Sequence, residues 1–93
     1  MIIRFKDAET RNIFDGRRSL LLPSEIQRAA QRKLIYLDEA DTLQDLVAPP
    51  GNRLERLKGD RAGQYSIRIN DQWRICFHWD GKNALDVEIT DYH

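Results

Sequence analysis

The feature that most constrains the fold is a period-two alternation of apolar and polar residues in the second half of the chain. Apolar side chains occupy every second position in three segments, 64–70, 73–79 and 84–90. Short turns around NDQ and DGKN separate these segments, and DGKN is a strong hairpin signal. We therefore predict three strands of an antiparallel meander with one apolar and one polar face. The apolar face of the last strand is expected to carry Leu85, Val87 and Ile89.

Shorter elements are predicted around this meander. Residues 1–5 alternate weakly and favour a first strand, and residues 53–59 favour another. Asp7 can cap a short helix that ends before Gly16, since both residue types are common at those positions. One helical turn is expected at 43–46, before the breaking sequence APPG.

A long amphipathic helix is predicted over residues 25–40. Ser24 and Gln27 have the spacing of a capping box at its start. Its apolar residues form one stripe along the helix, which is typical of a helix packed on a core. Ile35 lies opposite this stripe, either as an ordinary exposed residue or as a contact for a partner.

Together these patterns predict an α+β domain in which N-terminal helices pack on one face of a small antiparallel sheet. The 93 residues are expected to form a single domain, 1–93. Cys76 is the only cysteine, which excludes an intramolecular disulfide and a metal site built on several cysteines. The first seven residues carry charge, so we expect no signal peptide and no membrane span. A cytoplasmic protein is the expectation.

The charges are unevenly distributed although the formal net charge is zero. Six of the fifteen basic residues fall between Arg53 and Arg74, and four acids without a base lie between Asp38 and Asp45. Eleven of the basic residues are arginines, whose paired donors match phosphate geometry. Two interpretations remain open: one surface that faces phosphate, or ordinary solvated charge.

Three motifs resemble the HigB toxins, a family within the RelE-like toxins of bacterial toxin–antitoxin systems. They are LKGDRAGQYSI, QWRICF and DYH, in this order between residues 57 and 93. The N-terminal MIIRFKDAETRNIFDG also resembles the usual opening of that family, so the resemblance spans nearly the whole chain. The resemblance implies a RelE-like fold and a ribosome-dependent endoribonuclease that cuts messenger RNA in the A site without metal or cofactor. It also implies a HigA-like helix-turn-helix antitoxin, operator DNA contacted only through that antitoxin, and a bacterial cytoplasmic location.

The resemblance also assigns candidate site residues. Lys58 and Arg74 are cations that can flank one phosphate, and His93 titrates near neutrality. Tyr92 can stack on a base or hold a hydroxyl, and Asp91 can orient His93 or act as a base. The expected arrangement brings the last three residues to the open sheet face beside Arg74. Expected contacts with RNA or the ribosome are Arg68, Arg61 and Arg56.

Glu55 departs from the family pattern, because many relatives have histidine there. A carboxylate can replace histidine as a base, or the site can be weaker. A second hypothesis is therefore a catalytically weak or inactive member that binds the antitoxin and co-regulates its operon. We interpret His78 as a surface residue and Cys76 as a small strand residue rather than a nucleophile.

The aromatic residues of segment 73–79 have two interpretations. Trp73, Phe77 and Trp79 could form a stacking platform for bases, as in some RNA-binding sheets. They share the face assigned to helix packing, so a place in the core is predicted instead.

Overall fold

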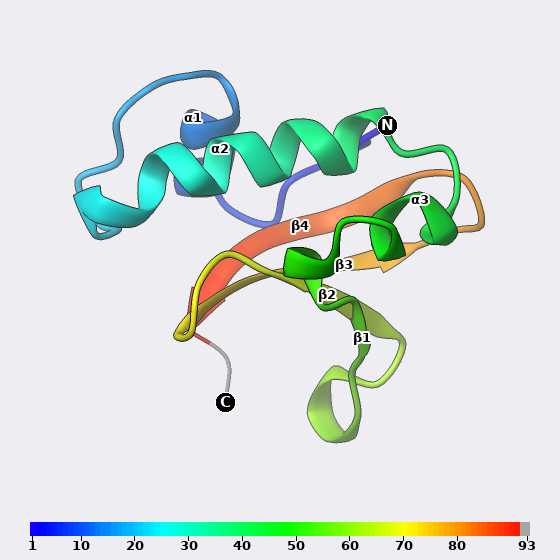
Figure 1. Cartoon of the computed structure of the whole chain (residues 1–93). Coiled ribbons are helices and arrows are strands. Elements are labelled where there is room, and N and C mark those ends of the chain that lie inside the picture. Colours follow the sequence, from blue (N-terminus) through cyan, green and yellow to red (C-terminus); the bar gives the residue numbers. More distant parts are fainter. Residues whose placement is uncertain (92–93) are drawn as a thin grey trace.

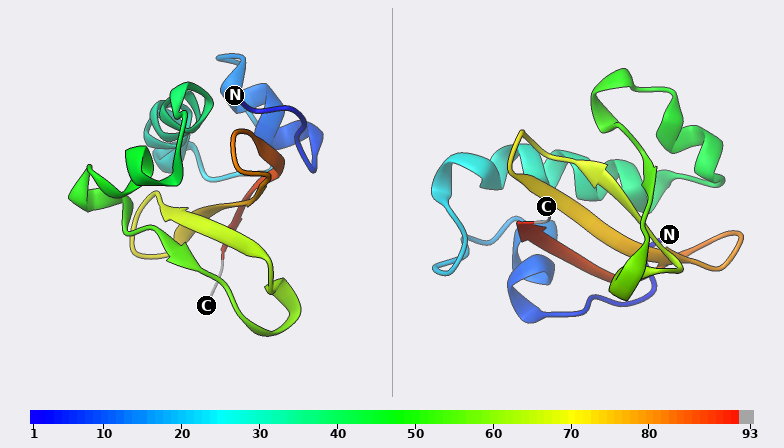
Figure 2. Two further views of the ribbon diagram at one scale, coloured as in Figure 1. Left: turned by 90° about the vertical axis from the view of Figure 1, so that its right-hand side faces the viewer. Right: turned by 90° about the horizontal axis from the view of Figure 1, so that it is seen from below.

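The computed structural model describes residues 1–91 and has a helical layer on one face of a four-stranded antiparallel sheet (Figure 1). The strands follow chain order, β1-β2-β3-β4. Seen from below, the sheet lies in front of α2 (Figure 2, right). The predicted α+β architecture is confirmed. The helices are α1 Ala8–Phe14, α2 Ser24–Glu39, α3 Leu43–Val47 and the short 3₁₀ turns η1 Pro50–Asn52 and η2 Gly59–Arg61; the strands are β1 Glu55–Arg56, β2 Gln64–Arg68, β3 Trp73–Trp79 and β4 Ala84–Asp91.

The core lies between the apolar stripe of α2 and the apolar face of the sheet. Leu34 and Leu37 of α2 are fully buried, as are Ile75 and Phe77 of β3. The tryptophans of β3 pack against this cluster. The prediction that the aromatic residues belong to the core, rather than to a base platform, is confirmed.

The start of α2 differs from the prediction. The helix includes Ser24, and Pro23 precedes it without a capping side chain. Gln27 instead reaches back to the preceding loop, where its Nε2 donates to the carbonyls of Ser19 and Leu22, each at 2.9 Å. The buried Ser19 hydroxyl in turn donates to Glu9 of α1 at 2.6 Å. Gln27 therefore fastens the loop to α2 and Ser19 fastens it to α1, and the predicted capping box is wrong.

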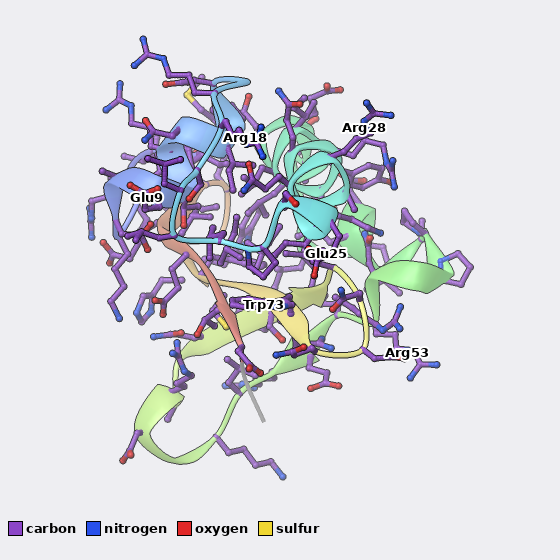
Figure 3. The ribbon with its side chains drawn as sticks, turned by 90° about the vertical axis from the view of Figure 1, so that its left-hand side faces the viewer. Glu9, Arg18, Glu25, Arg28, Arg53 and Trp73 are labelled. Atoms are coloured by element: carbon purple, nitrogen blue, oxygen red, sulfur yellow. The ribbon has the colours of Figure 1, made fainter. Side chains whose placement is uncertain are left out.

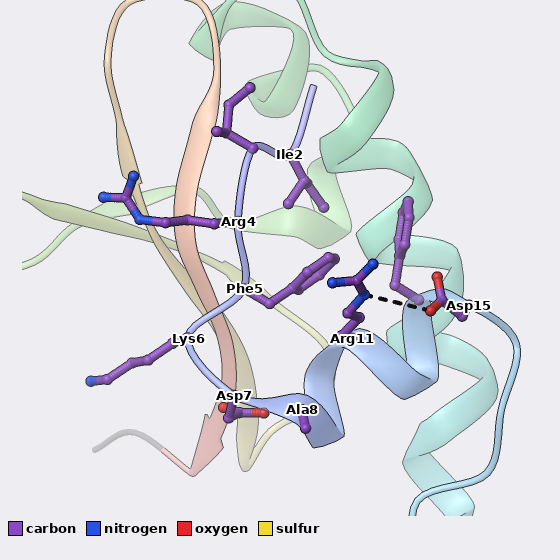
Figure 4. Close-up of a pocket in the computed structure, with 10 residues that line it drawn as sticks. Ile2, Arg4, Phe5, Lys6, Asp7, Ala8, Arg11 and Asp15 are labelled. Carbon is purple, nitrogen blue, oxygen red and sulfur yellow. Dashed lines mark ion pairs between the residues drawn. The ribbon is translucent and has the colours of Figure 1, made fainter.

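The N-terminal segment runs beside β4 but forms only isolated parallel bridges, Ile2 with Ala84 and Phe5 with Val87. Phe5 turns inward and packs on Phe14 of α1 with a centroid distance of 5.4 Å. Figure 4 shows that Arg4 and Lys6 point away from Phe5, toward the β4 side. The predicted first strand is thus reduced to two bridges.

A β-bulge interrupts β4 and changes which of its side chains face the core. Asp86 has φ 52°, in the left-handed region, and the register with β3 shifts there. As a result Ala84 pairs with Trp79 and is fully buried, while Leu85 pairs with His78 on the other face. The prediction for Leu85 is wrong, because the extra residue of the bulge reverses the alternation at that point.

The strand predicted over residues 53–59 is also shorter than expected. β1 has two residues, and the chain then turns at Gly59, whose φ is 65°. Among residues 1–91, no helix is both long enough and apolar enough to cross a membrane.

Candidate active site

Arg74 is the centre of the candidate site and is held in one orientation on the sheet face opposite the helices. Its Nε donates to the Ser66 hydroxyl at 2.7 Å, and one terminal nitrogen donates to the Arg53 carbonyl at 2.6 Å. Ser66 is fully buried, and 11% of the Arg74 side chain is exposed. The guanidinium is therefore fixed before any ligand arrives, which is what an electrostatic site for a developing charge requires.

The Arg53 carbonyl reaches Arg74 because the chain adopts a left-handed conformation directly after η1. Arg53 has φ 43° and ψ 57°, which costs a residue with a Cβ roughly 1–2 kcal/mol. Figure 3 shows the labelled Arg53 side chain extending away from the sheet. The backbone oxygen, rather than the side chain, thus serves the site.

Glu55 lies beside this guanidinium. Its carboxylate is 3.9 Å from a terminal nitrogen of Arg74, and its side chain is 55% exposed. Glu55 pairs with Ser66 in the β1–β2 register, so the two side chains lie on the same face. A carboxylate next to a fixed cation can accept a proton from a hydroxyl group that binds there.

Arg68 lies across from Arg74 in the β2–β3 register. The two arginines therefore share one sheet face, and Arg68 forms an ion pair with Asp71. Thr90 of β4 lies opposite Arg74 on its other side. This row of two guanidinium groups and a hydroxyl is suited to a phosphate.

Lys58 lies between β1 and η2. Its backbone is extended and its side chain is exposed. It makes no ion pair with any of residues 1–91. Arg56, in β1, is exposed and pairs with Tyr65, so it lies on the helix side of the sheet rather than on the Arg74 side. The backbone N–H of Leu57 donates to the Gln64 carbonyl, and Gln64 pairs with His78, so Lys58 follows at the His78 end of the sheet and the described contacts do not bring it to Arg74.

Part of the face predicted to be polar is in fact covered. Arg61 of η2 crosses the sheet and donates to Glu88 of β4 at 2.7 Å. Beneath this bridge, Leu57 is 5% exposed and Cys76 is fully buried. Burial raises the pKa of the Cys76 thiol. The thiol is thus a neutral packing group, in agreement with its interpretation as a structural residue.

Asp91 does not lie beside Arg74. It pairs with Trp73 in the β3–β4 register, and directly opposed residues share a face, so Asp91 lies on the helix side at the end of the sheet. Gln72 Nε2 donates to its carboxylate at 2.9 Å. The expectation that the strand places Asp91 on the open face was wrong, because alternation from the buried Ile89 leads to the opposite face. Tyr92 and His93 lie outside the described residues.

His78 lies four residues along β3 from Arg74, or about 13 Å at the rise of an extended strand. It pairs with Gln64 and Leu85. This distance supports its interpretation as a residue outside the site. Among residues 1–91, no group of three histidine, cysteine, aspartate or glutamate side chains could hold a metal ion.

Two components of the site were missed from the sequence. The alternation placed Ser66 on the face of Arg74 but did not show that its hydroxyl holds the guanidinium. The Arg53 carbonyl has no side-chain signal, although the preceding PPGN sequence signals the turn that aims it.

The two-layer α+β fold agrees with the RelE-like fold that the resemblance implied. The family model described as "RelE-like toxin of type II toxin-antitoxin system HigB" matches residues 3–93. The chain therefore belongs to the HigB-like toxin family, and it is a type II toxin with an antitoxin as its partner.

Individual relatives agree with this assignment. The chain is 45% identical to Toxin HigB-1 of Vibrio cholerae over 93 residues, which covers 99% of this chain and 98% of the relative. It is 30% identical to Endoribonuclease HigB of Proteus vulgaris over the full length of both chains. An uncharacterized protein of Haemophilus influenzae is 34% identical over 71 residues, or 76% of this chain and 70% of that protein.

Proposed function

We propose that this toxin is a metal-free endoribonuclease that cleaves messenger RNA in the ribosomal A site and so inhibits translation in the bacterial cytoplasm. The observation that carries the proposal is the fixed guanidinium of Arg74 with the Glu55 carboxylate 3.9 Å away. A cation held in place and an adjacent proton acceptor are two requirements of RNA cleavage through the 2′-hydroxyl.

In the proposed reaction, the 2′-oxygen of one nucleotide attacks the adjacent phosphorus. The bond from phosphorus to the 5′-oxygen of the next nucleotide breaks, and a 2′,3′-cyclic phosphate forms. Arg74 and Lys58 stabilise the extra negative charge on the phosphorane oxygens. A base takes the 2′-hydroxyl proton, and an acid gives a proton to the departing 5′-oxygen.

The base and the acid are assigned to the remaining candidates. Among residues 1–91, Glu55 has the carboxylate nearest to Arg74, and this carboxylate can accept the 2′-hydroxyl proton. His93, with an unperturbed pKa near 6.5, is suited to protonate the leaving oxygen. Tyr92 is proposed to stack on a base. Asp91 faces the other side of the sheet, so we propose that it supports the strand end through Gln72.

Arg68 and Arg61 have internal partners that shape their proposed roles. Arg68 pairs with the fully exposed side chain of Asp71, an exchangeable partner, and can contact the RNA backbone. Arg61 is engaged with Glu88, so we propose that it mainly holds η2 over the sheet. Arg56, at the β1 edge, is proposed to contact ribosomal RNA.

Dependence on the ribosome is consistent with the neutral charge of the chain. Affinity for free RNA comes mainly from neutralised phosphates, and a chain without excess positive charge gains little of it. A nuclease with little affinity for free RNA needs another molecule to bring the RNA to its active site. We propose that the ribosome, with messenger RNA in the A site, does so.

A second candidate function is favoured by the internal engagement of Arg74, which leaves 11% of its side chain exposed. Under this alternative the chain is catalytically weak, binds a HigA-like helix-turn-helix antitoxin and reaches operator DNA only through it. Expression in bacteria separates the two functions. The nuclease predicts growth arrest that Arg74→Ala or Lys58→Ala relieves, whereas Lys82→Ala, in the exposed β3–β4 turn, leaves it intact. Harmless wild-type protein would favour the alternative.

A further inference from the structure

The C-terminal half of α2 and the neighbouring α3 form a groove that the proposed reaction does not use. The Tyr36 hydroxyl donates to the carbonyl of Asp45 at 3.2 Å, which ties the two helices together. The groove therefore has walls that are set before any partner binds. It encloses about 440 Å³ and is lined by Tyr36, Glu39, Ala40, Gln44, Asp45 and Ala48.

Exposed apolar side chains occur on both helices that form this groove. Ile35 and Tyr36 of α2 are each 40% exposed, and Val47 of α3 is 49% exposed. These are three of the seven large exposed hydrophobic residues in the described part of the chain, and they fall within thirteen positions. Such a concentration on a helical face is typical of a protein contact.

The segment that forms the groove carries acidic residues only, and the neighbouring Lys33 is bonded to Asn52. Residues 34–48 include Asp38, Glu39, Asp41 and Asp45 and no lysine or arginine. Backbone N–H groups of Asp41 and Thr42 bond to Asp45 and hold the pKa of its carboxyl below the usual value. The carboxylate stays ionised at neutral pH. An anionic surface repels RNA and favours a cationic protein segment.

We propose that this groove docks the antitoxin through an amphipathic segment. An apolar side chain of that segment inserts against Tyr36, and flanking lysine or arginine side chains face Glu39 and Asp45. This is the helix-in-groove mode of recognition, with the charges fixing the register. The inference rests on the family membership, which supplies a protein antitoxin, and not on the proposed nuclease chemistry.

The position of the groove separates docking from catalysis. It belongs to the helical layer, whereas Arg74 and Ser66 lie on the opposite face of the sheet. Changes in the groove should therefore weaken the antitoxin without altering the toxin's own activity.

The test measures binding of the purified cognate antitoxin to variants of the full-length toxin by isothermal titration calorimetry. Glu39→Arg reverses a charge at the groove, and Gln44→Arg adds one without removing an existing contact. Glu25→Arg makes the same kind of change in the first turn of α2, away from the groove. Circular dichroism melts establish that each variant is folded.

We expect Glu39→Arg and Gln44→Arg to weaken binding about tenfold or more, because like charges meet across the interface. Glu25→Arg should stay within about threefold of wild type, as for an isolated surface charge. In cells, the groove variants should still arrest growth, and the antitoxin should no longer rescue it.

Three results would overturn the proposal. In one, the groove variants bind the antitoxin as tightly as Glu25→Arg does. In another, light scattering shows a toxin dimer that Gln44→Arg dissociates, which would assign the groove to a second copy. In the third, folded groove variants lose growth arrest when no antitoxin is present, which would assign it to the ribosome.

Discussion

Ser66 offers the sharpest test of how the site works, because it holds Arg74 without being a plausible reactant. The change Ser66→Ala removes the hydroxyl that accepts from Arg74 Nε at 2.7 Å, in a position that is fully buried. Water has little access there to replace the lost partner. A hydrogen bond to a charged group contributes roughly 1.5–3 kcal/mol.

The magnitude follows from that range. If the whole loss appears in the transition state, the cleavage rate falls by about tenfold to about 150-fold, at 1.36 kcal/mol per factor of ten. If the hydrogen bond also stabilises the free protein, its loss lowers the free energy of unfolding, by at most the same roughly 1.5–3 kcal/mol. Both effects are expected together, with the rate effect dominant, because the guanidinium becomes free to rotate.

The matched control is Thr10→Val. Thr10 is also fully buried, and its hydroxyl accepts from the backbone N–H of Ile89 at 3.0 Å. This substitution likewise removes a buried hydroxyl partner, but on the helix side of the sheet. It should lower stability by about 1 kcal/mol and leave the cleavage rate per folded molecule unchanged.

The assay is single-turnover cleavage of messenger RNA on stalled ribosomes, with thermal melts in parallel. The NMR signal of Arg74 Nε–H gives a readout that does not depend on substrate. It should be protected from exchange in wild type and in Thr10→Val, and exposed in Ser66→Ala. The reasoning is refuted if Ser66→Ala cleaves at the wild-type rate, or if Thr10→Val loses as much activity.

Three further predictions concern the fold around the site. Leu34→Ala should lower the free energy of unfolding by about 2–5 kcal/mol in urea titrations, because the side chain is fully buried; a loss below 1 kcal/mol would contradict the core described above. The Cys76 thiol has a raised pKa and is buried, so iodoacetamide should label it only after unfolding, and rapid labelling of native protein at pH 8 would contradict this. The pKa of Asp45 is lowered in the folded state, so its contribution to stability is present above its unfolded value near 3.8 and is lost as the pH falls through the lower folded value. Asp45→Asn should therefore flatten the dependence of the free energy of unfolding on pH below about pH 4. The same dependence in wild type and variant would show that the Asp45 carboxylate does not stabilise the fold.

Much of the architecture could be predicted because it depends on periodicity. The apolar stripe of α2 predicted that Leu34 is buried, and the alternation in β3 predicted the same for Ile75. Both side chains lie in the core between the helices and the sheet. Gly16 ends α1 with φ 83°, as expected of a residue after a helix. These features follow from local sequence alone.

The rest depends on contacts that periodicity does not encode. Alternation assigns Cys76 to the face opposite the helices, but it cannot show that η2 folds back and buries it through the Arg61–Glu88 pair. The bulge at Asp86 needs φ 52° in a residue with a Cβ. The Asp86 side chain forms an ion pair with Arg4, which is distant in the sequence. Long-range partners of this kind have no signature in a single sequence.

The same distinction holds for the candidate site. Resemblance supplied Arg74 and Lys58 as candidates, whereas the way Ser66 and the Arg53 carbonyl hold the guanidinium required the fold. Asp91 shows the reverse case. The resemblance placed it in the site, and the register turned it to the other face of the sheet.

The central claim is tested most directly by mapping RNA 5′ ends after adding purified toxin to one transcript in two states, free in solution and under translation by ribosomes. We predict cuts in the translated transcript, at the codon in the A site, and almost none in the free RNA. Arg74→Ala should reduce those cuts by about 10²–10³-fold. Equal cutting of free and translated RNA, or wild-type cutting by Arg74→Ala, would contradict the account.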